Sequence, residues 1–275
     1  MTELRTYANL WTLWDHPGCG DAEWSLARKV AAVAQAGFDG VMGELGQELG
    51  VLAAENKLHF LAFGRLDSGS DFQEVLARCR EEKAIVLQVH LGWHNTPIDE
   101  ALECALCLDR LGSEAGIAFV IETHRDTCTE TPEKTELLQR CFREATGGRK
   151  LPLLPDFSHH AVVKHVAQPF AARLLTEPEL IRNMRYHHFR PFNGHHAQIP
   201  VRKSDGSLTP EMQDWLVLAD EILRLLRDSP LSEVWICPEI GPVRGGYGLS
   251  TFPPSWPQAV ALRKLILEHW QAITA

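Results

Sequence analysis

The chain has 275 residues, of which 45% are hydrophobic and 23% are charged, and this composition excludes a largely disordered protein. The length suits one large α/β domain or two small ones. A formal net charge of −9 disfavours a nucleic-acid-binding protein, because such proteins usually present a basic face. No apolar run approaches the ~18 residues of a membrane span. The N-terminal segment MTELRTYANL lacks the basic and apolar regions of a secretory signal.

The seven cysteines are an odd number and are scattered along the chain. Cys104 and Cys107 form the only close pair, in a helical pattern, and no second pair has the spacing of a zinc site. We therefore expect no metal or redox role for this pair, and a reducing, cytoplasmic location for the protein.

Short apolar runs typical of strands alternate with amphipathic stretches typical of helices. In chain order, the expected strand and helix pairs are 6–13 with 21–37, 38–45 with 46–57, 59–64 with 71–82, 84–92 with 97–116, 117–124 with 131–147, 151–160 with 161–182, 183–190 with 209–228, and 232–241 with 253–273. Two helices have clear starts, since TPEK and TPEM each supply a threonine N-cap followed by a proline.

Eight β/α units in about 250 residues predict one (β/α)8 TIM barrel that spans residues 1–275 as a single domain. A doubly wound sheet is the alternative, but no GxGxxG follows the first strand. In a barrel we expect both chain ends on the face away from the site. No repeat or linker divides the chain, and the long loop at 190–208 is expected to be functional.

In a TIM barrel the chemistry lies at the C-terminal ends of the strands. Six of the expected strand ends carry a carboxylate or an imidazole. The candidates are Trp11, Trp14 and His16; Glu44; Arg65; His90, Trp93 and His94; Glu122, His124 and Arg125; Asp156, His159 and His160; His187, His188 and Arg190; and Glu239. Carboxylates that crowd together repel each other unless a cation neutralises them.

Two glutamates, one aspartate and one histidine form a mostly oxygen donor set, which suits Mn²⁺ or Mg²⁺ and could also take Zn²⁺ or Co²⁺. The segment RYHHFRPFNGHH at 185–196 holds four histidines, one of which would complete the set. Side chains alternate along a strand, so His187 and His188 point to opposite faces. Arg190 shares the face of His188, and we favour His188 as the ligand, with His187 packed against a helix.

The segments IETHRDT, DFSHH and HFR resemble the ETHR, DxSHW and HxR motifs of sugar phosphate isomerases and epimerases. These belong to the xylose isomerase-like TIM barrels, which also include inosose dehydratases and AP endonucleases. The resemblance covers nearly the whole chain. It is more specific for the superfamily than for any substrate, because each motif alone is short.

The resemblance implies that Glu122, Asp156, His188 and Glu239 bind one divalent metal ion. It also implies that His159, three residues after Asp156, contacts the substrate, and that Arg190 binds it. Two departures are evident. In the ketose epimerases the arginine lies further along the chain, and a second glutamate follows the first ligand by six residues, where this chain has Cys128.

Each candidate also has a purely structural interpretation. Glu122, Glu239 and Asp156 could cap the helices that follow them, and His159 and His160 could belong to a first helical turn. Arg125 could pair with neighbouring acids, Glu44 could be a first-turn helix acid, and Trp11, Trp14 and Trp93 could be core residues. His195 and His196 could be lid or surface residues. We expect His159, Arg190, His124, Trp14, Glu44 and His90 to contact the substrate.

These residues predict a metal-dependent sugar isomerase or epimerase in which Glu122 or Glu239 removes a proton next to a carbonyl. Loss of a β-hydroxyl would give a dehydratase instead. An AP endonuclease-like hydrolase, with His90 and His159 as extra ligands, and a sugar-binding barrel without catalysis are also open at this stage. The expected partner is a small carbohydrate, without nucleic acid or membrane, and assembly into a homo-oligomer is left open.

Overall fold

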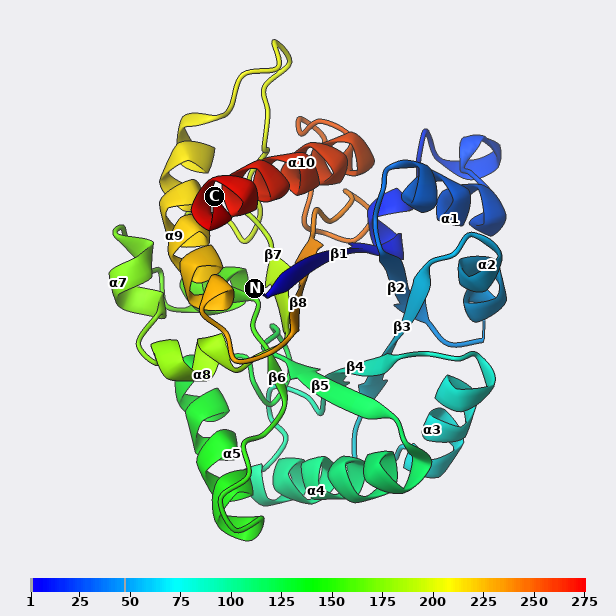
Figure 1. Cartoon of the computed structure of the whole chain (residues 1–275), viewed down its shortest axis with the longest axis vertical. Coiled ribbons are helices and arrows are strands. Elements are labelled where there is room, and N and C mark those ends of the chain that lie inside the picture. Colours follow the sequence, from blue (N-terminus) through cyan, green and yellow to red (C-terminus); the bar gives the residue numbers. More distant parts are fainter. Residues whose placement is uncertain (1, 47) are drawn as a thin grey trace.

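The computed structural model describes residues 2–46 and 48–275, and its elements alternate as the sequence predicts (Figure 1). The strands are β1 Glu3–Asn9, β2 Gly40–Glu44, β3 His59–Leu66, β4 Val86–Leu91, β5 Ala118–Glu122, β6 Leu153–Leu154, β7 Tyr186–Phe189 and β8 Glu233–Pro238. The α-helices are α1 Leu26–Gln35, α2 Leu49–Glu55, α3 Phe72–Glu81, α4 Ile98–Ala115, α5 Pro132–Ala145, α6 Phe157–Val163, α7 Phe170–Leu174, α8 Pro178–Arg182, α9 Pro210–Arg227 and α10 Ser255–Thr274. Two 3-10 helices, Leu10–Leu13 and Gly20–Ala22, follow β1.

The eight strands are parallel and form a barrel with helices around it. Hydrogen bonds join them in the order β6-β5-β4-β3-β2-β1-β8-β7. A single parallel bridge between Asp156 and His188 joins the two ends of this order, and the His188 N–H donates to the carbonyl of Pro155 at 3.1 Å. An open, doubly wound sheet would leave β6 and β7 apart. The prediction of a (β/α)8 TIM barrel is therefore confirmed.

The barrel interior is filled by every second residue of the strands. The cluster inside the barrel consists of Tyr7, Met42, Leu61, Val86, Leu154, Tyr186, Trp235 and Cys237, and a larger cluster packs between the strands and the helices. Because strand side chains alternate, the residues two and four positions further along also point inward. The apolar cluster thus forms the floor of the site, and the same alternation sets which side chains stand above it.

The first and sixth units differ from the prediction. The apolar run at 10–13 is a 3-10 helix, because the Asn9 side chain accepts the N–H of Trp11 and turns the chain. The sixth strand is only two residues long. The helix expected at 161–182 is instead the three short helices α6, α7 and α8. Pro169 precedes α7 and Pro178 is the first residue of α8, because proline interrupts a continuous helix.

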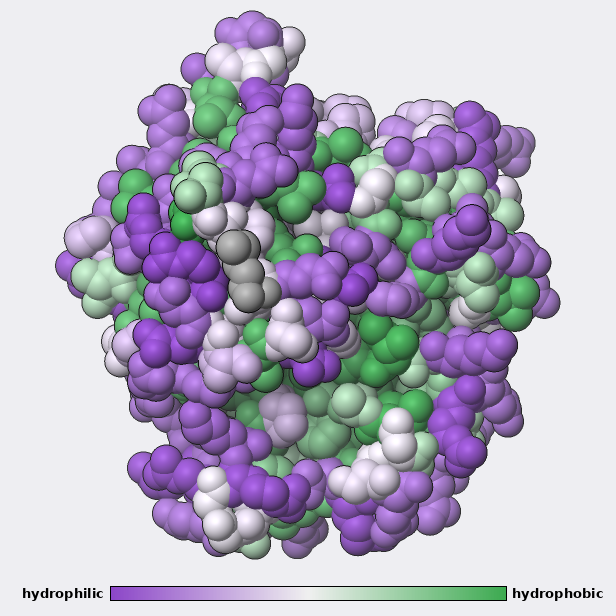
Figure 2. Space-filling model, viewed as in Figure 1, coloured by the Kyte–Doolittle hydropathy of each residue, from purple (hydrophilic) through white to green (hydrophobic). Residues whose placement is uncertain are grey.

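The two ends of the chain lie close together (Figure 1). The Thr2 hydroxyl donates to the carbonyl of Arg227, and the Arg227 side chain donates to the carbonyl of Ile273. These contacts are on the face where the strands begin, as expected. From the same side, hydrophilic residues dominate the outer helices, and hydrophobic residues are visible in the hollow between them (Figure 2).

Among the described residues, no helix combines the length and the apolar character needed to cross a membrane.

Candidate active site

Four donor side chains meet at the C-terminal ends of strands 5 to 8. Glu122 ends β5, Asp156 follows β6, His188 lies in β7 and Glu239 follows β8. One donor atom from each lies within 4.8 Å of the others, and all four residues are buried. The Nδ1 atom of His188 is 2.7 Å from Glu239 Oε2 and 3.2 Å from Glu122 Oε1. We call these four residues the tetrad.

The two adjacent histidines of β7 point to opposite sides of the strand. His188 faces the barrel interior and belongs to the tetrad. His187 is buried on the other side, where its Nε2 lies 3.1 Å from the carbonyl oxygen of Met184. Burial lowers the pKa of His187 to about 4, so this imidazole is neutral near pH 7. The alternation of the strand thus separates one site histidine from one packing histidine.

Asp156 is a helix N-cap and also lies in the tetrad. Its Oδ1 accepts the N–H of Ser158 at 2.9 Å, so the residue is the N-cap of α6. Its Oδ2 faces the tetrad and accepts from Nε of Arg190 at 3.1 Å. One carboxylate oxygen therefore starts a helix, and the other is available to the site.

Arg190 lies among the carboxylates and is almost completely buried. Besides Asp156 it bonds Glu239, with Nη2 2.7 Å from Oε2. Burial alone would raise the pKa of Glu239, but Arg190 and His188 outweigh it and lower the pKa to about 2. Burial would lower the pKa of His188, but Glu239 and Glu122 outweigh burial and raise it to about 10.

Side chains from β1, the segment after it and β4 hold the two glutamates in place. The Glu122 Oε2 atom accepts from Gln88 Nε2 at 2.6 Å and lies 2.8 Å from His90 Nε2. The Glu239 Oε1 atom accepts from Asn9 Nδ2 at 2.6 Å and from Trp11 Nε1 at 2.9 Å.

Asn9 and Gln88 were not among the predicted site residues. Alternation alone would have found them, since Asn9 lies two residues after the inward-facing Tyr7 and Gln88 two residues before His90. Trp11 is a site residue and not a core residue, because its indole N–H bonds Glu239.

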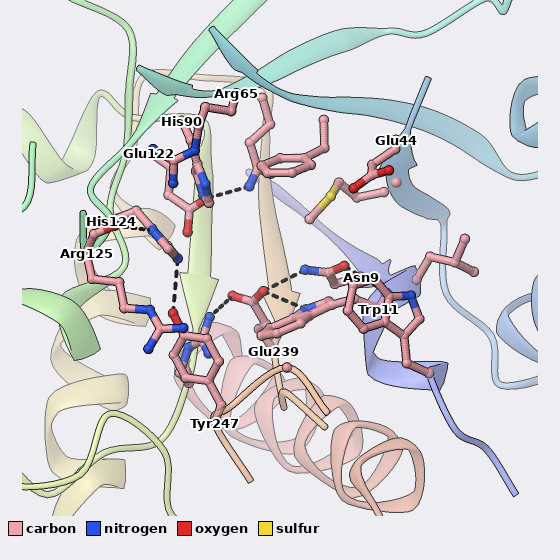
Figure 3. A pocket seen from close by; sticks show the side chains of 18 residues that line it. Asn9, Trp11, Glu44, Arg65, His90, Glu122, His124, Arg125, Glu239 and Tyr247 are labelled. Atoms are coloured by element: carbon pink, nitrogen blue, oxygen red, sulfur yellow. Dashed lines mark hydrogen bonds and ion pairs between the residues drawn. The ribbon is translucent and has the colours of Figure 1, made fainter. Parts of the chain in front are cut away.

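Glu122 and Glu239 of the tetrad line a cavity of about 340 Å³ (Figure 3). Figure 3 shows His90, Glu122, His124 and Arg125 along one wall and Asn9 and Trp11 on the opposite wall. Of the predicted substrate contacts, Trp14, Glu44, His90, His124 and Arg190 line this cavity.

The structure also decides the alternatives for Glu44 and places His159 and His160 outside this cavity. Glu44 ends β2 and precedes α2, so it is not a first-turn helix acid. His159 is absent from the lining of this cavity and lines a second one beside it. His160 is buried against the carbonyl of Thr129, at 3.2 Å, and lies outside both cavities.

Tyr247, in the loop between β8 and α10, reaches across the mouth of the barrel to His124. The pKa of His124 is lowered to about 3, mainly by burial, so its imidazole is neutral. Its Nδ1 lies 2.7 Å from the carbonyl oxygen of Arg125 and must carry the proton to bond it. Nε2 is then an acceptor, and the Tyr247 hydroxyl, 3.0 Å away, donates to it. Sequence reasoning missed Tyr247 because it lies in a glycine-rich loop beyond a strand end.

The tetrad fits a divalent cation. Three carboxylates converge around His188, and an imidazole that binds a metal ion gives up its proton, which would leave Arg190 as the cationic side chain in contact with Asp156 and Glu239. The Nε2 atom of the buried His188 has no hydrogen-bond partner among the described residues, and its Nδ1 atom faces the carboxylates of Glu122 and Glu239. Oxygen-rich sets with one imidazole suit Mn²⁺, Mg²⁺ or Zn²⁺. His124 lies near His90 and Glu122 in a second group of donor atoms, but both of its ring nitrogens are already bonded.

No protein-family model and no curated protein sequence matches this chain, but solved structures resemble it in fold. The probable 3-DHS dehydratase AsbF of Bacillus anthracis has a TM-score of 0.59 and 14% identity, over 96% of this chain and 98% of that one. A xylose isomerase-like TIM barrel protein of Mycobacterium smegmatis, in complex with magnesium, has a TM-score of 0.59 and 14% identity over 100% and 98%. The 3-keto-D-glucoside 4-epimerase YcjR of E. coli has a TM-score of 0.58 and 13% identity over 98% and 100%. These likenesses show that the chain shares its (β/α)8 barrel fold with these proteins, one of which is described as a xylose isomerase-like TIM barrel protein.

Proposed function

We propose that this protein is a divalent-metal-dependent isomerase or epimerase of a sugar or sugar derivative, acting by proton transfer next to a carbonyl. The observation that carries the proposal is the tetrad of Glu122, Asp156, His188 and Glu239, of which Glu122 and Glu239 line a cavity of about 340 Å³. A cavity of this size is within the range of small-molecule sites. The proteins of similar fold include an epimerase and a dehydratase, which supports this class of reaction.

The tetrad would hold the metal ion, which when bound polarises a substrate carbonyl and stabilises negative charge on its oxygen. Glu122 and Glu239 supply the proton-transfer groups, since positive neighbours lower the pKa of both carboxyls and keep them ionised at neutral pH. They project from β5 and β8 into the same cavity, so a sugar bound against both can lose a proton to one carboxylate and regain it from the other. Asn9, Trp11 and Gln88 hold these carboxylates in place by hydrogen bonds.

A dehydratase is the second candidate, and Tyr247 is the observation that favours it. Elimination of a β-hydroxyl needs an acid to protonate the leaving oxygen. The Tyr247 phenol lines the same cavity, and burial raises its pKa, so it keeps its proton. Both candidates share the removal of a proton next to a carbonyl and differ only in the second step, which is reprotonation or loss of water.

Solvent-deuterium exchange tests the shared step. The protein is incubated in D₂O with Mn²⁺ and a panel of ketoses, inososes and keto-glycosides, and incorporation is followed by NMR. We expect exchange into at least one compound, its loss with a chelator and its recovery on addition of Mn²⁺. Retained carbon skeletons with altered stereochemistry support epimerisation, and loss of water supports the dehydratase.

Two variants test the roles of the glutamates. Glu122→Gln and Glu239→Gln should each abolish exchange, and at least one should still bind Mn²⁺, because glutamine keeps the shape of the side chain but cannot take a proton. Glu233→Gln, at the opposite end of β8, is the matched control and should exchange at the wild-type rate. Wild-type exchange in both site variants would contradict the proposal and favour the hydrolase or the non-catalytic sugar-binding barrel. A cytoplasmic location and the lack of nucleic-acid binding stay predictions.

A further inference from the structure

A second cavity of about 390 Å³ lies beside the first, and the proposed reaction does not use it. Helix α6, the segment 196–198 and the loop that follows β8 form its walls. Its lining includes His159, Val162, Val163, Gln198, Leu249 and Phe252. The Gln198 side chain donates to the carbonyl of Gly241 at 2.9 Å and accepts the N–H of the same residue, which ties the 190–208 loop to the loop after β8.

The two cavities share one wall, formed by Tyr247 and Arg125. The Tyr247 ring lies between two guanidinium groups, with Arg190 4.1 Å and Arg125 4.3 Å from its centroid. Such contacts are attractive, and the hydroxyl is also bonded to His124. These contacts hold the ring in place, and it forms part of the lining of both cavities.

The lining of the second cavity is mainly apolar although it opens to solvent. Val163 and Leu249 are 45% and 54% exposed, and they belong to a small set of large hydrophobic residues that the fold leaves in water. Trp14, Trp93 and Val243 of the same set also lie in loops at this end of the barrel. Exposed apolar side chains gathered around a cavity mark a binding surface.

Polar side chains also line this cavity, namely Arg125, Glu130, His159, His196 and Gln198. The His159 side chain is 2% exposed, and its Nε2, which lies 3.4 Å from Asp156 Oδ2, makes no hydrogen bond to the described residues. A buried polar atom without a partner is costly, and a bound ligand can satisfy it. His159 touches a substrate from this position only if the substrate extends beyond the first cavity.

Building on the proposed function, we propose that the substrate is a sugar that carries an apolar aryl or alkyl substituent. The sugar occupies the first cavity, and the substituent passes the edge of Tyr247 into the second, where it packs on Val163 and Leu249. A free monosaccharide would leave the second cavity and its exposed apolar lining without an occupant. The substrate class is therefore a glycoside or a similar conjugate.

A matched pair of ligands tests this inference without knowledge of the reaction. Methyl and phenyl β-D-glucopyranoside carry the same sugar and differ in the substituent, and their affinities for the Mn²⁺-loaded protein are compared by calorimetry. We expect the phenyl compound to bind at least about tenfold more tightly, because burial of a ring removes apolar surface from water. The double variant Val163→Asn, Leu249→Asn should bring this ratio close to one. Val217→Asn, at an exposed valine of α9, should leave it unchanged.

Equal affinities in the wild type, no binding of either compound, or an unchanged ratio in the double variant would each overturn the inference. So would a crystal structure in which a second copy of the chain fills the cavity. The test is separate from that of the proposed function. If exchange occurs without a phenyl preference, only the extended substrate is wrong. If a phenyl preference is found without exchange into any compound, the proposed reaction is wrong.

Discussion

Replacement of Arg190 by methionine removes the buried positive charge that two carboxylates of the tetrad share. Arg190 bonds Asp156 at 3.1 Å and Glu239 at 2.7 Å, and all three side chains are at most 3% exposed. Methionine is close in length and apolar, so it fills most of the same space. The substitution therefore tests charge more than packing.

The expected cost follows from the burial of this ion pair. Removal of one partner from a buried pair typically destabilises a protein by about 3–5 kcal/mol, because the remaining charge is left unpaired. Burial already raises the pKa of Asp156, and without Arg190 that pKa rises further, so Asp156 can take up a proton and limit the loss. In a chain of this size we expect the melting temperature to fall by roughly 10 °C. Arg224→Met, at an exposed helix pair with Glu221, is the control and should cost less than about 1 kcal/mol.

A divalent cation should compensate for the lost guanidinium. We expect Mn²⁺ to raise the melting temperature of Arg190→Met by more than that of the wild type, because the ion replaces a missing positive charge in the variant but adds to an existing one in the wild type. Thermal unfolding is followed by circular dichroism with and without Mn²⁺ after treatment with a chelator. A loss below about 1 kcal/mol, or an equal gain from Mn²⁺ in both proteins, would refute the role given to Arg190.

Three further predictions test other parts of the structure. Tyr247→Phe keeps the ring near its two arginines but removes the phenol that would protonate a leaving oxygen, so we expect roughly tenfold slower loss of water from the substrate with stability unchanged to within about 1 kcal/mol, measured by NMR and thermal unfolding; an unchanged rate of water loss would exclude the phenol as this acid. His187 has a pKa of about 4 when folded against an ordinary 6.5, so the unfolded chain binds more protons between these values, and stability should fall by up to roughly 3 kcal/mol as the pH drops through this window. Denaturant titrations at several pH values should show a shallower decline in His187→Gln, and an unaltered slope would argue against this histidine. Gly50→Ala places a methyl group against the backbone oxygen of Glu82, so we expect a loss of about 2 kcal/mol or more, and a neutral result would mean that α2 shifts freely.

The sequence predicted the order of the strands and helices better than it predicted the residues at which each one begins and ends. Apolar periodicity separated strands from helices, and the order of eight units predicted the barrel that the structure confirms. The predicted element boundaries were wrong where a side-chain hydrogen bond to the backbone starts a helix inside an apolar run. Asn9 turns an apolar run into a 3-10 helix, and Asp156 begins α6 almost directly after the two residues of β6.

For the candidate site, too, part was predictable from the sequence and part depended on the tertiary structure. The sequence by itself determined that Glu122, Asp156, His188 and Glu239 stand together, since parallel strands of a barrel end at one face and alternate residues share one side. Only the tertiary structure decided what surrounds them, because those contacts join residues that are distant in the chain. Arg190 lies between Asp156 and Glu239. Tyr247 reaches across the mouth of the barrel to His124 from a loop whose apolar residues follow no regular spacing. Loop paths depend on the surfaces against which they pack, so the wall that the two cavities share could not be predicted from local sequence.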